Sequence, residues 1–174
     1  MKVCVLTGQR QLEWTEREIP QPAAGELQIK LEYVGICGSD LHFYDQGRLA
    51  NWELDGPLAL GHEPGGVVTA IGEGVTGFEI GDKVAIEPAV PCGKCEACRT
   101  GHYNLCPDVK MLAIPHERDG VFAEYCTHDA TMCFKLPENM GTMEGGLLEP
   151  LTVGMHGTEL SNAKIGETAI VLGC

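Results

Sequence analysis

Four cysteines with short, regular spacing are the clearest chemical signal in this sequence. They follow the pattern Cys92-x2-Cys95-x2-Cys98-x7-Cys106. Four thiolates in one short loop can surround a tetrahedral Zn²⁺, and a closed shell of four thiolates leaves no position for a substrate. The rival interpretation is an iron–sulfur cluster, but ferredoxins place the last cysteine three residues after the third, not seven. The spacing therefore favours a structural zinc ion.

The adjacent residues His62 and Glu63 are a second candidate for metal binding. Neighbouring side chains in a strand point to opposite faces, so a regular strand could not bring both to one ion. Gly61 before the pair and Pro64 after it predict a tight turn, which could aim both side chains at one point. The alternative is a surface turn with a solvated histidine and glutamate, and the surrounding motifs must decide between the two.

Cys37 lies upstream of this pair in a glycine-flanked loop, Gly35-Ile36-Cys37-Gly38-Ser39-Asp40. Residues 61–75 then follow the pattern GHE-x2-G-x5-G-x2-V. Together with the cysteine loop, these motifs resemble the zinc-dependent medium-chain alcohol dehydrogenases. The resemblance extends over essentially the whole chain. It implies a mainly β fold with short helices (α+β), the GroES-like catalytic domain of that family.

Three further segments are similar to the polyol branch of the family, the sorbitol and xylitol dehydrogenases. They are Ala85-Ile86-Glu87-Pro88, the run GHYNLCP at 101–107 and the run EPLTVG at 149–154. Simple alcohol dehydrogenases typically have a cysteine ligand where this chain has Glu149. A carboxylate at that position is similar to the polyol enzymes, which include D-xylulose reductases.

The resemblance to polyol enzymes implies a set of ligands. Cys37, His62 and Glu63 would bind a catalytic zinc, and Glu149 would lie close by, joined through a water or exchanging with a ligand. The loop of residues 91–107 would hold the structural zinc, which gives two zinc ions per chain.

The residue types suit this chemistry. A thiolate at Cys37 and a carboxylate at Glu63 offset the two charges of the ion, while a neutral His62 leaves the site uncharged. A catalytic zinc keeps one open position, and a hydroxyl bound there loses its proton far more easily. Hydride then passes to a nicotinamide, which the resemblance implies is NAD. Ser39 and His42 follow Cys37 at the offsets of the family's proton relay. The alternatives are a helix cap for Ser39 and a solvated or packed imidazole for His42.

Composition excludes several other functions. The net charge of −13 repels phosphate backbones, which argues against nucleic-acid partners. No apolar run is long enough to span a bilayer, and the N-terminal run is too short for a signal peptide. Nine cysteines are many for this length, and an odd number cannot form a complete set of internal disulfides. We therefore expect a cytoplasmic protein with metal-bound cysteines.

The first part of the chain reads as β structure interrupted by glycine and proline. Alternating or continuous apolar runs predict strands. A short helix, capped by Ser39 or Asp40, is expected after Cys37, and Pro64 fits the first turn of a helix. Three aromatic residues, Phe43, Tyr44 and Phe122, either line a substrate cleft or pack in the core. The predicted strands cover residues 3–6, 27–33, 67–71, 83–86, 122–127 and 133–136.

The character of the chain changes near Pro137. Residues 142–160 predict one or two helices with glycine interruptions, and the apolar run 168–172 predicts a buried parallel strand. Gly173 is the first glycine of a dinucleotide-binding turn in the related enzymes. We therefore expect a fragment with a zinc-binding domain at 1–155 and, at 156–174, a connecting helix and the first strand of a truncated nucleotide-binding domain.

The leading interpretation is the substrate-side domain of a zinc- and NAD-dependent polyol dehydrogenase that is inactive as this fragment and a homo-oligomer (tetramer or dimer) when full length. A threonine or other secondary-alcohol dehydrogenase of the same family is a close alternative. A non-catalytic zinc module is an alternative from a different class, and it would hold metal only in the four-cysteine loop.

Overall fold

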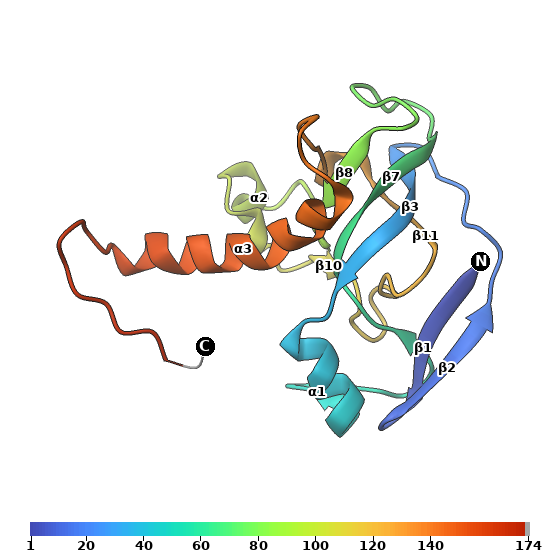
Figure 1. Cartoon of the computed structure of the whole chain (residues 1–174), viewed down its shortest axis with the longest axis horizontal. Coiled ribbons are helices and arrows are strands. Elements are labelled where there is room, and N and C mark those ends of the chain that lie inside the picture. Colours follow the sequence, from blue (N-terminus) through green and yellow to red (C-terminus); the bar gives the residue numbers. More distant parts are fainter. Residues whose placement is uncertain (173–174) are drawn as a thin grey trace.

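A curled antiparallel sheet of five strands forms the centre of the protein (Figure 1). The computed structural model describes residues 1–172. The strand order is β11-β3-β7-β8-β12, so the long strands β3 and β7 lie side by side in the middle of the sheet. The bounds are β3 (Glu26–Gly35), β7 (Glu63–Ile71), β8 (Lys83–Ile86), β11 (Tyr125–Asp129) and β12 (Cys133–Lys135).

Alternating apolar residues give this sheet its buried face. In β3, Leu27 and Ile29 are fully buried, and Ile29 pairs with Val68 of β7, which is also fully buried. Each such side chain contributes about 1.5–3 kcal/mol when it is removed from water. The buried members of this core are Leu27, Ile29, Leu31, Val68, Val84, Ile86, Leu112, Val121 and Cys133.

A second, three-stranded sheet has the order β2-β1-β6. Its strands are β1 (Lys2–Gly8), β2 (Gln11–Glu16) and β6 (Leu58–Ala59). Strand β2 was not predicted. Its apolar residues Leu12 and Trp14 alternate with polar ones, but both are exposed at the edge of the sheet. Phe43 is fully buried in a core cluster beside this sheet, with Tyr44 and Phe122 packed against it. Phe43 is thus a core residue, while Tyr44 and Phe122 are partly buried beside it.

Most predicted strands are present, with two main differences. The strand predicted at 122–127 begins only at Tyr125. Strand β7 begins at Glu63, four residues earlier than predicted, so Pro64 lies in a strand and not in a helix. Pairing with β3 continues as far as Gly35 opposite Glu63, and this ladder extends the strand through a proline and two glycines.

Helix α1 (Gly38–Gln46) begins directly after Cys37, which is the N-cap residue. The predicted cap residues, Ser39 and Asp40, therefore lie two and three residues after the true cap. Ser39 lies inside the first turn, and Asp40 is the third helical residue, whose carboxylate accepts a hydrogen bond from the Cys37 N–H at 2.9 Å. An acidic residue in the first turn is the usual complement to the free N–H groups there.

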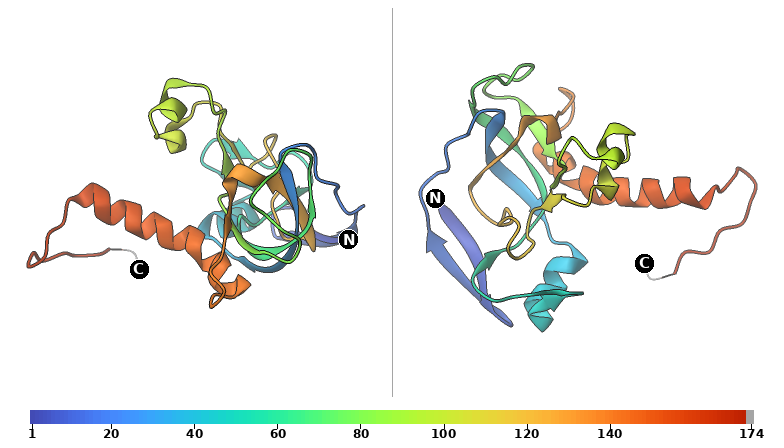
Figure 2. Two further views of the ribbon diagram at one scale, coloured as in Figure 1. Left: turned by 90° about the horizontal axis from the view of Figure 1, so that it is seen from above. Right: turned by 180° about the vertical axis from the view of Figure 1, so that it is seen from behind.

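Helix α3 (Thr142–Ser161) is one continuous helix, so the predicted glycine interruptions do not break it. Its first half packs against the central sheet, and its second half projects away from the body (Figures 1 and 2). The side chains of residues 150–161 are exposed. No described helix is long and apolar enough to cross a membrane.

The strand predicted at 168–172 is wrong: these residues have no regular secondary structure and are exposed. A parallel strand is stable only between neighbours that bury both its faces, and no described strand lies beside this segment. Gly173 lies outside the described residues. The short remaining elements are β4 (Arg48–Leu49), β5 (Trp52–Glu53), β9 (Ala89–Val90), α2 (Glu96–Arg99), η1 (Tyr103–Leu105), β10 (Lys110–Met111) and η2 (Ala130–Met132).

Candidate metal centres

Cys37, His62 and Glu63 come together at the point where β3 ends and β7 begins. One donor atom from each residue lies within 4.8 Å of the other two. Cys37 lies between β3 and α1, His62 directly precedes β7, and Glu63 is the first residue of β7. We call this group the Cys-His-Glu site. His62 and Glu63 are buried, each 6% exposed, and Cys37 is half-buried.

Two glycines make this arrangement possible. Gly35 pairs with Glu63, and a Cβ at Gly35 would lie 2.0 Å from Glu63 Oε2, so glycine leaves the space that the carboxylate fills. Gly61 has a φ of +87° and its position is packed against Phe122, where a Cβ would meet the ring at 2.5 Å. A positive φ favours glycine. Gly61 therefore bends the backbone just before His62, but residues 60–64 form no tight turn and Pro64 lies within β7, so the turn predicted there is wrong.

Asp40 holds the site together and was overlooked as a functional residue in the sequence. Its carboxylate is 3% exposed. One oxygen accepts a hydrogen bond from Cys37 N–H and the other accepts one from Gly61 N–H, both at 2.9 Å. The latter oxygen lies 3.8 Å from His62 Nδ1. The signal that could have found it is an acidic residue three positions after a candidate ligand at a helix start.

The donor set fits a zinc ion. Zinc binds sulfur at about 2.3 Å and nitrogen or oxygen at about 2.0–2.2 Å, so neighbouring ligand atoms in a tetrahedron lie about 3.3–3.8 Å apart. Donor atoms within 4.8 Å of one another reach that spacing with small side-chain rotations. One thiolate and one carboxylate balance the two charges of the ion, and three protein ligands leave a fourth position open.

Glu149 lies next to this site but not among its three closely spaced donors. It is half-buried on α3, one face of which packs on β7. Burial, together with the negative charges of Glu63 and Glu87, raises the pKa of Glu149 to about 7. Burial also raises the pKa of Glu87. Without a cation nearby, the two neighbouring negative charges disfavour the ionisation of Glu149.

The two predicted proton-relay residues lie on α1. Ser39 is half-buried and His42 is exposed. They are three residues apart and therefore share one face of the helix. The Nδ1 atom of His42 lies 3.4 Å from Gln46 Nε2. The geometry thus places Ser39 nearer the interior and His42 nearer solvent.

The four-cysteine loop brings its thiols together as the spacing predicts. The Sγ atoms of Cys95 and Cys98 are 3.4 Å apart, and those of Cys92 and Cys98 are 4.0 Å apart. These separations match the edge of a tetrahedron of sulfur atoms around one zinc, about 3.8 Å. Hydrogen bonds from the N–H groups of Lys94 and Cys95 lower the pKa of Cys92 to about 6. Burial raises the pKa of Cys98 to about 12, so an ion must displace its proton.

Two cysteines outside the two sites, Cys126 and Cys133, have thiols that burial keeps neutral. Burial raises the pKa of both Cys126 and Cys133 to about 12. These thiols are therefore neutral at ordinary pH, and the thiolate is the reactive form.

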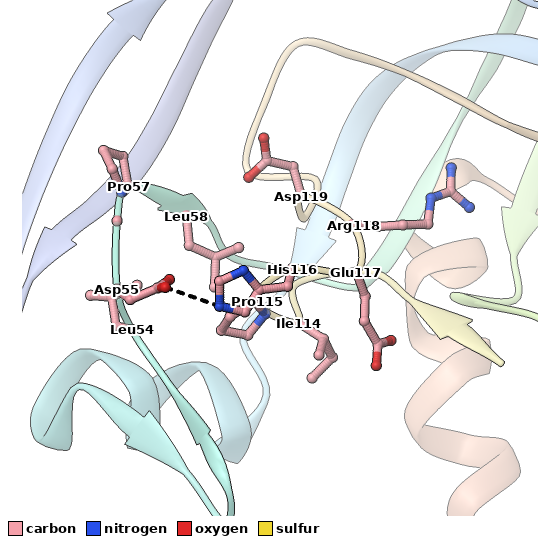
Figure 3. A pocket seen from close by; sticks show the side chains of 11 residues that line it. Leu54, Asp55, Pro57, Leu58, Ile114, Pro115, His116, Glu117, Arg118 and Asp119 are labelled. Atoms are coloured by element: carbon pink, nitrogen blue, oxygen red, sulfur yellow. Dashed lines mark ion pairs between the residues drawn. The ribbon is translucent and has the colours of Figure 1, made fainter. Parts of the chain in front are cut away.

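A cavity of about 270 Å³ lies between the segments 54–58 and 114–119 (Figure 3). The Asp55 and His116 side chains face each other there, with His116 Nε2 3.1 Å from Asp55 Oδ2. None of the Cys-His-Glu residues lines this cavity. The Asp55–His116 pair is largely exposed, and exposed pairs contribute at most about 1 kcal/mol.

His128 is fully buried and is held in one tautomer. Its Nε2–H donates to the carbonyl oxygen of Glu87 at 2.8 Å, and its Nδ1 accepts from Arg118 Nη1 at 3.3 Å. Burial, and then the charge of Arg118, lower the pKa of His128 to about 4. A neutral imidazole with both nitrogens bonded is a structural link between β11 and the segment after β8.

Comparison with known proteins assigns the family. Residues 23–138 match the family described as alcohol dehydrogenase GroES-like domain. The chain belongs to this family. Its relatives include the zinc-type medium-chain dehydrogenases, and the mainly β, GroES-like fold predicted from sequence is confirmed.

Three similar proteins illustrate the relationship. Sorbitol dehydrogenase of Bacillus subtilis is 41% identical over 173 residues, which cover 99% of this chain and 49% of that protein. A solved oxidoreductase of unknown specificity from Escherichia coli has a TM-score of 0.89 and 42% identity, covering 96% of this chain and 48% of its own. An Escherichia coli alcohol dehydrogenase complexed with NADH has a TM-score of 0.83 and 36% identity, and the match covers 94% of this chain and 46% of that one. The GroES-like chain described here thus spans about half the length of the relatives it matches.

Proposed function

We propose that this chain is the substrate-side domain of an oxidoreductase that transfers hydride between a polyol, of the sorbitol or xylitol type, and NAD. The observation that carries the proposal is the Cys-His-Glu site: a sulfur, a nitrogen and an oxygen donor lie within 4.8 Å of one another at the end of a glycine-lined strand pair. Similarity to sorbitol dehydrogenase supports the polyol class. Similarity to an enzyme solved with NADH supports the cofactor.

Seven residues would hold two zinc ions. Cys37, His62 and Glu63 would bind the catalytic ion, and the loop within 91–107 would bind the structural ion through Cys92, Cys95, Cys98 and Cys106. A zinc ion at the first site supplies Lewis-acid stabilisation of the negative charge that develops on the substrate hydroxyl oxygen. Asp40 orients both Cys37 and Gly61, and it therefore fixes the geometry of the site.

The remaining roles concern protons. Ser39, half-buried beside Cys37, accepts the proton from the substrate hydroxyl, and His42 passes it to solvent from the exposed side of α1. Glu149, half-buried on α3 beside the site, would be a neighbouring carboxylate of the zinc, joined through a water or exchanging with a ligand.

The wider organisation is also a proposal. Residues 1–155 form the zinc-binding domain, and residues 156–174, with Gly173, lead into a nucleotide-binding domain. The chain by itself would hold zinc without oxidising polyols, because most of the cofactor domain of its relatives has no counterpart in it. The whole enzyme would work in the cytoplasm as a homo-oligomer, without nucleic-acid or membrane partners.

Metal analysis tests this proposal. The purified chain should be colourless and contain about two zinc ions, Cys37→Ser should contain about one, and the matched control Cys4→Ser should keep both. A chain that holds a single zinc with or without Cys37 would support a zinc module instead. The enzyme of full family length, assayed with NAD on a panel of polyols, secondary alcohols and threonine, would then distinguish the substrate classes.

A further inference from the structure

Helix α3 touches strand β7 backbone to backbone. A Cβ at Gly65 of β7 would lie 1.8 Å from the carbonyl oxygen of Thr142 and 2.8 Å from the amide nitrogen of Gly146. A Cβ at Gly146 would lie 3.1 Å from the carbonyl oxygen of Glu63. The helix therefore rests on the strand at a distance that only glycine permits, and any side chain at Gly65 would displace one element from the other.

This contact lies one helical turn before Glu149. Residues three and four apart share one face of a helix, so Glu149 leaves α3 on the same side as Gly145 and Gly146. Its negative charge interacts with that of Glu63. The backbone carbonyl of Glu63 takes part in the contact between α3 and β7. One backbone contact thus fixes the position of both carboxylates, one on the strand and one on the helix.

We propose that Gly65 and Gly146 are positioning residues that set how far the Glu149 carboxylate reaches toward the Cys-His-Glu site. The inference rests on the proposed function, because it requires zinc at that site. Moving α3 outward by a few tenths of an ångström would withdraw Glu149 while leaving the three ligands in place on β7 and before α1.

The same helix offers a matched control. A Cβ at Gly154 would meet no atom within 4 Å, and Gly154 has ordinary helical backbone. Alanine in place of glycine raises helix propensity equally at both positions. Gly146→Ala and Gly154→Ala therefore differ in the contact with β7. Gly146→Ala is the primary variant because its nearest contact is 3.1 Å, a mild displacement, whereas Gly65→Ala meets backbone at 1.8 Å.

The experiment measures zinc affinity of the 174-residue chain at the Cys-His-Glu site by competition with a chromophoric chelator. Absorption of the cobalt-substituted chain reports the ligand geometry independently of affinity. Gly146→Ala should weaken affinity about three- to tenfold, the size of a typical coupling between neighbours, and shift the cobalt spectrum. Gly154→Ala should match the wild type in both measurements.

A double-mutant cycle with Glu149→Gln decides whether the glycine acts through Glu149. Glu149→Gln alone should weaken affinity about 10–100-fold, as loss of a partner beside the ligands does, and adding Gly146→Ala should then change nothing further. Equal affinities for Gly146→Ala and Gly154→Ala, or an undiminished effect of Gly146→Ala in the Glu149→Gln background, would overturn the positioning inference alone. Absence of zinc from this site in the wild-type chain would overturn the proposed function itself.

Discussion

The carboxylate of Asp40 accepts a hydrogen bond from the N–H of Gly61 at 2.9 Å, across 21 residues of sequence. Its second oxygen accepts one from the N–H of Cys37 at the same distance. One buried side chain therefore connects the loop that carries Cys37 to the segment that carries His62. Two of the three candidate ligands depend on it for their spacing.

The variant Asp40→Asn tests this connection. An amide has one acceptor oxygen, so at least one of the two N–H groups loses its partner. Leaving a buried donor unpaired costs about 1–3 kcal/mol. We expect a loss of that size in the free energy of urea unfolding, together with weaker zinc binding at the Cys-His-Glu site.

Asp45 provides the control for this variant, because it lies on the same helix but is exposed and paired with Arg10. Asp45→Asn should change the free energy of unfolding by less than about 1 kcal/mol and leave zinc binding intact. Equal effects of the two substitutions would show that Asp40 has no special role in joining Cys37 to His62.

Removal of metal should unfold the four-cysteine loop selectively. Among its residues only Cys106 is fully buried, so zinc replaces a core that the loop lacks. After treatment with a strong chelator, trypsin should cleave at the exposed Lys94 and Arg99 at least about tenfold faster, because local opening governs the rate. Lys30, within the central strand β3, should stay protected. Unchanged cleavage at Lys94 would contradict a structural metal.

His128 should make stability depend on pH between about 4 and 6.5. The folded-state pKa of about 4 lies below the ordinary value of 6.5, so the unfolded chain binds more protons in this window. Stability is therefore complete above pH 6.5 and falls with acidification until about pH 4, by up to about 3 kcal/mol.

The variant His128→Asn isolates this contribution. Its unfolding free energy should be lower than that of the wild type at pH 8, and the difference should shrink as the pH falls. Both chains should be measured in a Glu149→Gln background. The raised pKa of Glu149, about 7, makes stability fall as pH rises from about 4.5 to 7, and this opposes the pH dependence that His128 produces. A difference that stays constant from pH 8 to pH 4 would argue against a neutral, buried His128.

Phe43→Ala should act on stability. Phe43 is 1% exposed within a core cluster, and deleting a buried aromatic ring costs about 3–5 kcal/mol. Phe134→Ala, the same deletion at a ring that is 53% exposed, should cost less than about 1 kcal/mol. A destabilisation by Phe43→Ala no larger than that of Phe134→Ala would rule out the core role.

The candidate ligands could be predicted from the sequence because local motifs contain them. The four cysteines lie in one short segment whose spacing indicates metal, whereas the ligand role of His62 and Glu63 was predicted from the resemblance of the surrounding motifs to the zinc-dependent dehydrogenases. Asp40 was overlooked because its two partners are distant amides, which no local pattern reveals. Strand β2 was missed for a similar reason: the alternation of Leu12 and Trp14 is short, and pairing with β1 is what makes the segment a strand.

The errors share one cause, the dependence of local structure on distant neighbours. Pro64 resembles a helix start, but pairing with β3 keeps it in a strand. Residues 168–172 have the composition of a buried strand, but the described chain supplies no sheet beside them. The need for glycine at Gly65 also depends on α3, more than 70 residues away in sequence.

The projecting half of α3 has a consequence for amide hydrogen exchange. From Leu151 onward the helix is exposed on every side, and an isolated helical segment of this length is only marginally stable in water. Amides of the second turn, which are hydrogen-bonded within the helix and rest on the sheet, should therefore exchange slowly, whereas those near Leu160 should exchange at rates close to those of a free peptide. Protection of the backbone amides from exchange would therefore decline along α3 from the glycine contact outward.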